Sequence, residues 1–158
     1  MSAGPQGAAP AADAQALAER AVAHMLAHDA FSRWLGVEVL EVAPRRSVAR
    51  MRVRAEMLNG FGIAHGGVTF ALADSAFAFA CNSHASISVA LENVMSYPNA
   101  AREGDVLTAT AEAEIEPRRI GVYRVTVANQ HGAVVGLFRG TCYDTRRPLL
   151  AASAEADD

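Results

Sequence analysis

The segment from Asn59 to Asn82 constrains the fold more than any other part of the chain. It opens with a glycine-rich turn and continues, from Val68 to Cys81, as a run that is apolar on nearly every face of a helix. The polar exceptions are Thr69, Asp74 and Ser75. Because a helix that is apolar all round is a buried helix, the rest of the chain must pack around it. Asp74 then lies where an unpaired carboxylate costs free energy, which makes it a functional candidate.

The size and charge of the chain limit the classes of function. Its 158 residues fit one domain, which is large enough for a core but small for a cleft built by a single subunit. The net charge of -3 lacks the basic excess that nucleic-acid binding needs. No apolar run approaches the ~20 residues of a membrane span, and no signal peptide is recognisable. Two cysteines without metal-site or CxxC spacing fit a reducing cytoplasm, so we expect a cytoplasmic protein with no nucleic-acid or membrane partner.

Both ends of the chain are poor in residues that a core could bury. Residues 1–12 are mainly Ala, Gly and Pro, and residues 149–158 are Ala-rich and acidic, so we expect two disordered tails. Residues 13–148 between them form a single domain. This domain begins with apolar side chains at helical spacing, which predict an amphipathic helix with Asp13 as its N-cap and its end near His28.

The apolar period changes from 3.6 to 2 after Gly36, which indicates β-strands. A short apolar turn over residues 31–36 precedes the change. Two alternating runs around the Pro44-Arg45-Arg46 turn predict a hairpin, and the buried helix follows it. Long strand-like runs with short connections then predict an antiparallel meander. These runs cover residues 87–97, 106–116, 121–129 and 133–143. The assembled picture belongs to the α+β class: a long central helix wrapped by a bent antiparallel sheet.

Several blocks of the sequence resemble the PaaI-type thioesterases, a family of acyl-CoA hydrolases in the hotdog-fold superfamily. The blocks span about residues 25–145 and read MLNGFGIAHGGVTFALADSAFAFACNS, REGDVLTATAE, RRIGVYRVTVANQHG and VGLFRGTCY. The resemblance implies a hotdog domain that forms homodimers with active sites shared between subunits, and a homotetramer as the complete assembly. It also implies a coenzyme A ester of an aryl acid as substrate, such as phenylacetyl- or hydroxyphenylacetyl-CoA.

The His65-Gly66-Gly67 turn opens the buried helix. The first N–H groups of a helix have no partner inside it, so they can form an oxyanion hole for a thioester carbonyl. The same glycines could instead only permit a tight turn. The resemblance assigns the oxyanion donor to Gly66 and groups Gly67 with substrate binding. His65 has no neighbouring Ser or Cys nucleophile, so we expect it to shape the loop by hydrogen bonding, with contact to the thioester as the alternative.

Asp74 lies eight residues beyond Gly66, or about 12 Å along a helix, so one thioester carbonyl cannot touch both within one chain. A productive site therefore needs an antiparallel helix from a second subunit. Asp74 could attack the thioester carbon, could activate water as a general base, or could be a structural interface carboxylate. The resemblance makes Asn59 a residue that positions water or the carboxylate across the interface, although an Asn beside Gly is also ordinary turn chemistry.

Several further residues are candidates for holding the substrate. Arg118 and Arg119, ahead of Gly121, would neutralise coenzyme A phosphates, although Arg pairs at turns are often only solvated. Phe77 would line an aryl pocket or belong to the core. Asn82, at the end of the helix, is a further candidate for substrate binding.

The chain departs from the family pattern on the run that follows the helix. Tyr97-Pro98-Asn99-Ala100 stands where relatives read Phe-Leu-Arg-Pro, so a basic residue is lost. Glu92 and Asn93 replace small or apolar residues, and Glu92 is either a strand-surface side chain or a second buried acid near the site. These changes bear on acyl specificity or on the coenzyme A contact.

The sequence thus predicts an acyl-CoA thioesterase that uses neither a cofactor nor a metal. The spacing of His65, Asp74 and His84 is not that of a metal site, and no serine has a GxSxG setting. Two alternatives use the same fold: a non-catalytic acyl-CoA-binding module and an enoyl-CoA hydratase. The Asp-x-Asn-Pro-x-His pattern of one hydratase branch is absent, and the intact Asp74 argues against a binding module.

Overall fold

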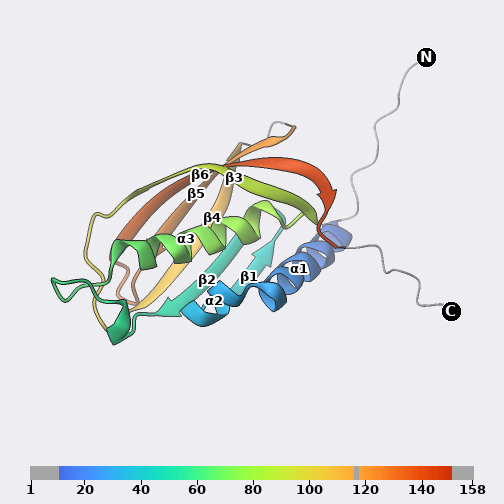
Figure 1. Cartoon of the computed structure of the whole chain (residues 1–158). Coiled ribbons are helices and arrows are strands. Elements are labelled where there is room, and N and C mark those ends of the chain that lie inside the picture. The colour runs from blue at the N-terminus through green and yellow to red at the C-terminus, as the bar shows by residue number, and fades with distance from the viewer. Residues whose placement is uncertain (1–10, 116–117, 151–158) are drawn as a thin grey trace, which may run out of the picture.

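One long helix lies against the concave side of a six-stranded antiparallel sheet (Figure 1). The structure is a computed structural model and describes residues 11–115 and 118–150. The helices are α1 (Ala11–His28), α2 (Ala30–Leu35) and α3 (Gly66–Cys81), with a 3₁₀ turn at Ala55–Met57. The strands are β1 (Glu38–Ala43), β2 (Arg46–Arg52), β3 (Ser86–Ser96), β4 (Val106–Ile115), β5 (Ile120–Ala128) and β6 (Val134–Pro148). The α+β class, the long central helix and the predicted strands are confirmed.

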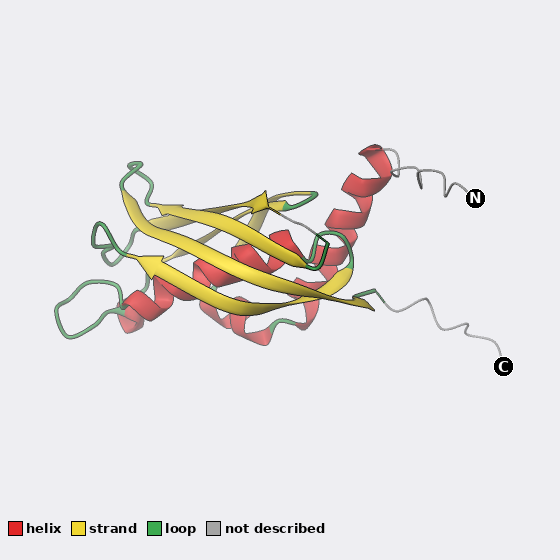
Figure 2. Cartoon of the chain, turned by 90° about the horizontal axis from the view of Figure 1, so that it is seen from above, coloured by secondary structure: helices red, strands yellow, loops and turns green. Residues whose placement is uncertain are grey.

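The order of the strands in the sheet is β1-β2-β4-β5-β6-β3, so the predicted meander is wrong at one strand. β4, β5 and β6 follow one another as hairpins, but β3 pairs with β6 at the far edge. The reason is α3, which stands between β2 and β3 in the chain and carries the backbone along the length of the sheet before β3 begins. β1 and β3 are therefore the two edges, and Figure 2 shows the helices on one side of the strands.

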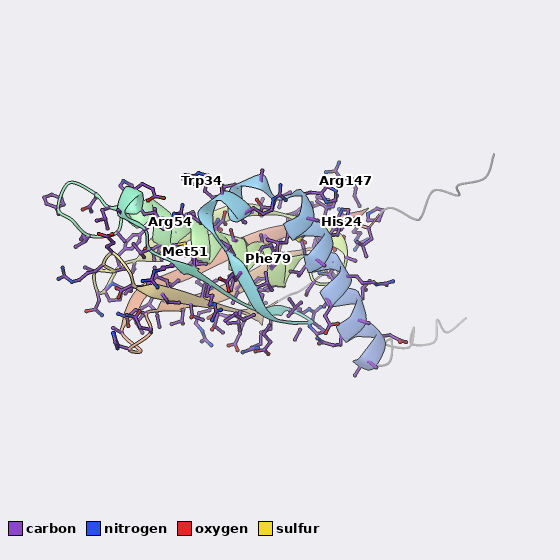
Figure 3. All side chains as sticks on the ribbon, turned by 90° about the horizontal axis from the view of Figure 1, so that it is seen from below. His24, Trp34, Met51, Arg54, Phe79 and Arg147 are labelled. Atoms are coloured by element: carbon purple, nitrogen blue, oxygen red, sulfur yellow. The ribbon has the colours of Figure 1, made fainter. Side chains whose placement is uncertain are left out.

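α3 is the centre of the core, as its apolar sequence predicts. Phe77 and Phe79 on the helix are fully buried, together with Met51 of β2 and Phe138 of β6. Phe77 packs edge-on against Tyr123 of β5, with ring centroids 5.6 Å apart. Figure 3 shows Met51 and Phe79 inside the molecule, between the strands and the helices. Removing this apolar surface from water is the main stabilising contribution to the fold.

The segment before the sheet differs from the expectation at both of its helices. α1 begins at Ala11, so Asp13 lies in its first turn and is not the N-cap. The apolar turn over residues 31–36 is the helix α2, capped by the side chain of Asp29 and closed by Gly36 in a left-handed conformation with φ of 83°. Of the two predicted tails, residues 1–10 and 151–158 lie outside the described residues.

α2 supplies the partner for one of the three polar side chains of α3. Ser32 Oγ bonds Asp29 at 2.5 Å and lies 2.9 Å from Ser75 Oγ, so Ser75 is satisfied across the α2–α3 contact. At the exposed end of α2, Arg54 donates to the carbonyl of Leu35 and stands 5.9 Å from the ring of Trp34, and both side chains are labelled in Figure 3. Among the described residues, neither Asp74 nor Thr69 has a hydrogen-bond partner on α2.

The two faces of the sheet separate charge from the core. On β2, β4 and β5, buried side chains alternate with partly or fully exposed ones. The polar side carries a network of ion pairs through which Arg46, Arg124 and Arg139 meet Glu112 and Glu114. The concave side facing α3 is mainly apolar and carries no charged side chain from these strands. Its buried Ser47 on β2 donates to the Ala76 carbonyl of α3. Among the described helices, none is long and apolar enough to cross a membrane.

Candidate active site

The N-terminus of α3 presents one unused backbone donor. His65 is the N-cap, and its Nδ1 accepts a hydrogen bond from the Gly67 N–H at 3.0 Å, so the neutral ring carries its proton on Nε2. The Gly66 N–H makes no hydrogen bond among the described residues. Because aligned peptide dipoles leave partial positive charge at this end of a helix, the Gly66 amide can bind a developing oxyanion. Gly67 is engaged by His65 and has no such capacity.

A surface groove lies beside that donor. It is lined by the loop before α3, by the start of α3 and by the segment that follows β3, including Asn59, Gly66, Thr69, Tyr97, Asn99 and Ala101. Asn59 Oδ1 accepts from the N–H groups of Phe61 and Ile63, which is the turn role considered for it, while its Nδ2 has no partner within the described chain. The groove therefore brings together Gly66 and an amide donor from Asn59.

Tyr97 forms one wall of this groove. Its hydroxyl donates to the Gly66 carbonyl at 3.1 Å, and a methyl group added at Gly66 would lie 3.3 Å from its ring. The phenol thus stands against the first residue of α3 and limits the space beside the candidate donor. The sequence singled Tyr97 out only as a departure from the family pattern, because nothing in the spacing shows that it folds back onto residue 66.

Asp74 lies two turns further along α3 and is partly buried. Burial raises the pKa of this carboxyl, while a hydrogen bond from Asn93 acts in the opposite direction. In that bond Asn93 Nδ2 donates to Asp74 Oδ1 at 2.8 Å. Oδ2 makes no hydrogen bond among the described residues. One carboxylate oxygen is thus held, and the other is available for chemistry.

Asp74 and Gly66 do not meet within one chain. Eight residues of continuous helix separate them, or about 12 Å of rise. Asp74 is absent from the groove that holds Gly66 and Asn59. A single chain therefore presents two half-sites, one at the end of α3 and one at its middle, which agrees with the spacing argument from the sequence.

The predicted phosphate-binding residues lie together at the opposite end of the molecule. Arg118, Arg119 and Gly121 line a pocket beyond the C-terminus of α3, together with Arg45, His84, Ser88, Cys142 and Asp144. Arg119 donates to the hydroxyl of Tyr143 at 2.6 Å and stacks on its ring, so one of the two arginines is held in place. Asp144 brings negative charge to the same pocket, 3.7 Å from His84.

Three residues that the sequence suggested as site candidates lie instead in the core, at a helix end and at the surface. Phe77 is core and lines no described groove, so the acyl-pocket interpretation finds no support in the isolated chain. Asn82 is buried and caps α3; its Nδ2 donates to the Ala78 carbonyl, and its Oδ1 accepts from the Ser88 N–H. Both polar side-chain atoms of Asn82 are thus engaged within the chain. Glu92 is exposed on β3, so it is not a second buried acid.

Asn93 is the functional candidate that the sequence did not find. In the sequence it is only a polar residue at a position where the family pattern has small or apolar ones. The missing information was the register: a β-bulge between Ala90 and Glu92 sets which later residues of β3 face α3. Among the described residues, no group of three or more His, Cys, Asp or Glu side chains could hold a metal ion.

Known proteins agree with this architecture. The model of the thioesterase superfamily matches residues 61–135. The acyl-coenzyme A thioesterase PaaI of Escherichia coli (strain K12) is 40% identical over 116 residues, which cover 73% of this chain and 83% of that protein. The solved E. coli PaaI protein from the phenylacetic acid degradation operon gives a TM-score of 0.83 at 35% identity, covering 85% of this chain and 97% of that one.

A second solved structure is similar at lower identity. A hypothetical thioesterase from Streptococcus pneumoniae TIGR4, determined with coenzyme A, has a TM-score of 0.68 and 28% identity, over 71% of this chain and 88% of that chain. The family model, the relatives and the fold all point the same way. The chain therefore belongs to the thioesterase superfamily, as a thioester hydrolase of the PaaI type with the hotdog fold.

Proposed function

We propose that this protein hydrolyses aryl-acyl-CoA thioesters, such as phenylacetyl-CoA or its hydroxylated forms, to the free acid and coenzyme A. The observation that carries the proposal is the pair of half-sites on α3: an unused Gly66 N–H at a helix N-terminus and a partly buried Asp74 with one free carboxylate oxygen. Similarity to the E. coli acyl-CoA thioesterase supports the reaction, and the operon named for that protein supports the aryl acid.

The Gly66 amide would bind the thioester carbonyl oxygen and stabilise the charge that develops on it. Asp74 could then act in either of two ways. As a nucleophile, its Oδ2 attacks the carbonyl carbon, the C–S bond breaks with release of the thiolate, and water hydrolyses the mixed anhydride. As a general base, it takes a proton from water, the resulting hydroxide attacks the same carbon, and the proton passes to the departing sulfur. Neither route uses a metal or a cofactor. The expectation that the enzyme needs neither stays a prediction.

The complete site would form between two copies of the chain. An antiparallel partner helix would place its Asp74 near Gly66 of the first chain, since the two groups lie too far apart within one helix. The edge strand β3 offers the surface for such a partner, because its exposed side chains include Val89, Leu91 and Val94. We propose a homodimer as the catalytic unit and a homotetramer as the assembly. The cytoplasmic location also stays a prediction.

Coenzyme A would extend from the thioester toward the pocket of Arg118, Arg119 and Gly121. The guanidinium groups suit phosphate oxygens, and Arg119 is held by Tyr143. The coenzyme A bound to the similar S. pneumoniae protein supports a nucleotide site in this family. Asp144 opposes anion binding there, so this assignment depends on Arg118 and Arg119 outweighing one carboxylate.

The test is release of free thiol from a panel of coenzyme A esters: phenylacetyl, hydroxyphenylacetyl, acetyl, hexanoyl and palmitoyl. We expect turnover of the aryl esters and a loss of at least about a hundredfold in kcat for Asp74→Asn. Full activity of Asp74→Asn would refute the proposed chemistry. Binding of the esters without turnover would favour a binding module, and a change in enoyl-CoA absorbance without thiol release would favour a hydratase.

A further inference from the structure

Asn93 is partly buried, and its amide oxygen lies in a setting that ordinary packing does not explain. Its side chain comes from β3, on the side facing α3, and its Oδ1 is inaccessible to solvent and has no hydrogen-bond partner. Leaving a buried amide oxygen without a donor costs free energy, and a Leu of similar size would not incur that cost. The compensating contact is the 2.8 Å hydrogen bond from Asn93 Nδ2 to Asp74 Oδ1.

The neighbouring strand is shaped to admit this side chain. Asn93 pairs with Gly140 of β6, and a methyl group at Gly140 would lie 3.0 Å from Asn93 Oδ1. The same methyl group would lie 2.9 Å from Phe138 and 3.0 Å from Phe77 on α3. A glycine at this register position therefore leaves the room in which the Asn93 amide turns toward the helix.

No charged group of the described chain competes with Asn93 for Asp74. On the strands packed against α3, the titratable side chains in the core are Tyr123 of β5 and Cys142 of β6, and Cys81 is on the helix itself. The charged side chains of β1, β2, β4, β5 and β6 lie outside the core, as the ion pairs show, and Glu92 of β3 is exposed. Burial and the Asn93 hydrogen bond are the two influences on the pKa of Asp74.

We propose that Asn93 is a positioning residue for Asp74: its amide fixes Oδ1 and thereby leaves Oδ2 as the oxygen that acts on the thioester or on water. The inference rests on the proposed function, because it assigns Asn93 a role in the same site. A hydrogen bond to the carboxylate also favours its ionised form, which is the form that either chemical route requires. Asn93 touches no reacting atom in this scheme and acts through Asp74 alone.

The experiment compares the pH dependence of kcat/KM for phenylacetyl-CoA in the wild type, Asn93→Leu and Asn93→Ala. Both variants remove the donor, so the acid limb of the profile should move to higher pH, and kcat should fall about ten- to a hundredfold at neutral pH. Asn93→Gln, which keeps an amide, should recover part of the loss. Gln130→Met is the matched control, because Gln130 donates to Asp105 at 2.9 Å in a distant loop and its loss should leave the acid limb unchanged.

The outcomes separate this inference from the proposed function. An active Asp74→Asn, or a wild type without turnover, would remove the function and the inference with it. An inactive Asp74→Asn beside an unchanged acid limb in the Asn93 variants would overturn the positioning role alone. If Asn93→Leu does not fold, Asn93→Ala decides, because it removes the same donor without adding bulk against Gly140, and circular dichroism verifies its fold.

Discussion

At the scale of single residues, the central feature is one carboxylate on an apolar helix. Ser75 finds its partner on α2, whereas Asp74 has only the Asn93 amide to offset its burial. Burial raises the pKa of Asp74, so the folded chain holds a proton there more tightly than the unfolded chain does. A group kept at a cost in stability is expected where catalysis needs it.

The first prediction concerns the pH dependence of that cost. Because the folded pKa of Asp74 is raised, protonation of this carboxyl favours the folded chain. This stabilisation is fully present below the unfolded pKa of about 3.9 and is lost as the pH rises through the folded pKa. Asp74→Asn removes this loss, so its free energy of unfolding should exceed that of the wild type at pH 7, with a smaller difference at pH 4.5. Urea denaturation at both pH values measures it.

A control of opposite sign is available in the loop after β3. The pKa of Asp105 is lowered, chiefly by the hydrogen bond from the Arg102 N–H, so ionised Asp105 favours folding. Asp105→Asn should therefore lose stability at pH 7 and lose less as pH falls. Equal effects of the two substitutions would show that burial of Asp74 does not govern the titration.

The second prediction isolates the Gly66 donor. Gly66 is the first residue of α3, where proline is well tolerated, and the preceding His65 has φ of -62° and ψ of 132°, which proline accepts. Gly66→Pro should keep the helix but remove the N–H, with a loss in kcat of about a hundred- to a thousandfold. Gly66→Ala keeps the N–H and meets the same Tyr97 ring, so it should retain most activity. Equal losses in both variants would assign the effect to crowding.

At the scale of elements, the register between β3 and β6 decides what surrounds α3. The bulge on β3 sets which residues face the helix, and Gly140 opposite Asn93 leaves the space that the amide occupies. The strand therefore contributes to the site although it carries none of the residues that resemble the family motif.

The third prediction tests this coupling of strand and helix. Gly140→Ala should lower the free energy of unfolding by about 1–3 kcal/mol, because the added methyl group meets Phe77, Phe138 and Asn93 at 3.0 Å or less. Gly60→Ala is the matched control, since no atom lies within 4 Å of a methyl group there. Urea denaturation of both variants measures the difference, and equal stability would show that the strands relax without cost.

At the scale of the whole molecule, the two half-sites require two chains. Mixing the two variants tests whether each active site is shared between two chains, because Asp74→Asn and Gly66→Pro damage different half-sites. If sites are shared, a mixed dimer has one site with both defects and one intact site, and statistical mixing restores about a quarter of wild-type activity. Unfolding and refolding the two inactive variants together, followed by the thiol-release assay, measures it. Each variant refolded alone is the control, and no recovery in the mixture would place the whole site in one chain.

Sequence patterns predicted the helices and strands well, but they predicted less well which of these elements pack against one another. The buried helix, the hairpin before it and the four later strands follow from local period and turn residues, which are properties of neighbours in the chain. The meander was wrong because strand pairing across the sheet is a long-range choice, and the period of β3 says nothing about its partner. The helix α2 was missed because six residues give too little periodicity to separate a helix from a turn.

By itself, the sequence determined the central helix and the two candidate half-sites, because these depend on residue types at fixed separations along one element. The class of fold followed from the order and period of the predicted elements, and the family from the resemblance of several blocks along the chain. Only the tertiary structure decided that β3 crosses to β6, that Asn93 holds Asp74, that Tyr97 folds over Gly66, and that Phe77 and Asn82 serve the core. These facts depend on contacts between residues far apart in the chain. Register and packing fix such contacts, and no local pattern encodes them.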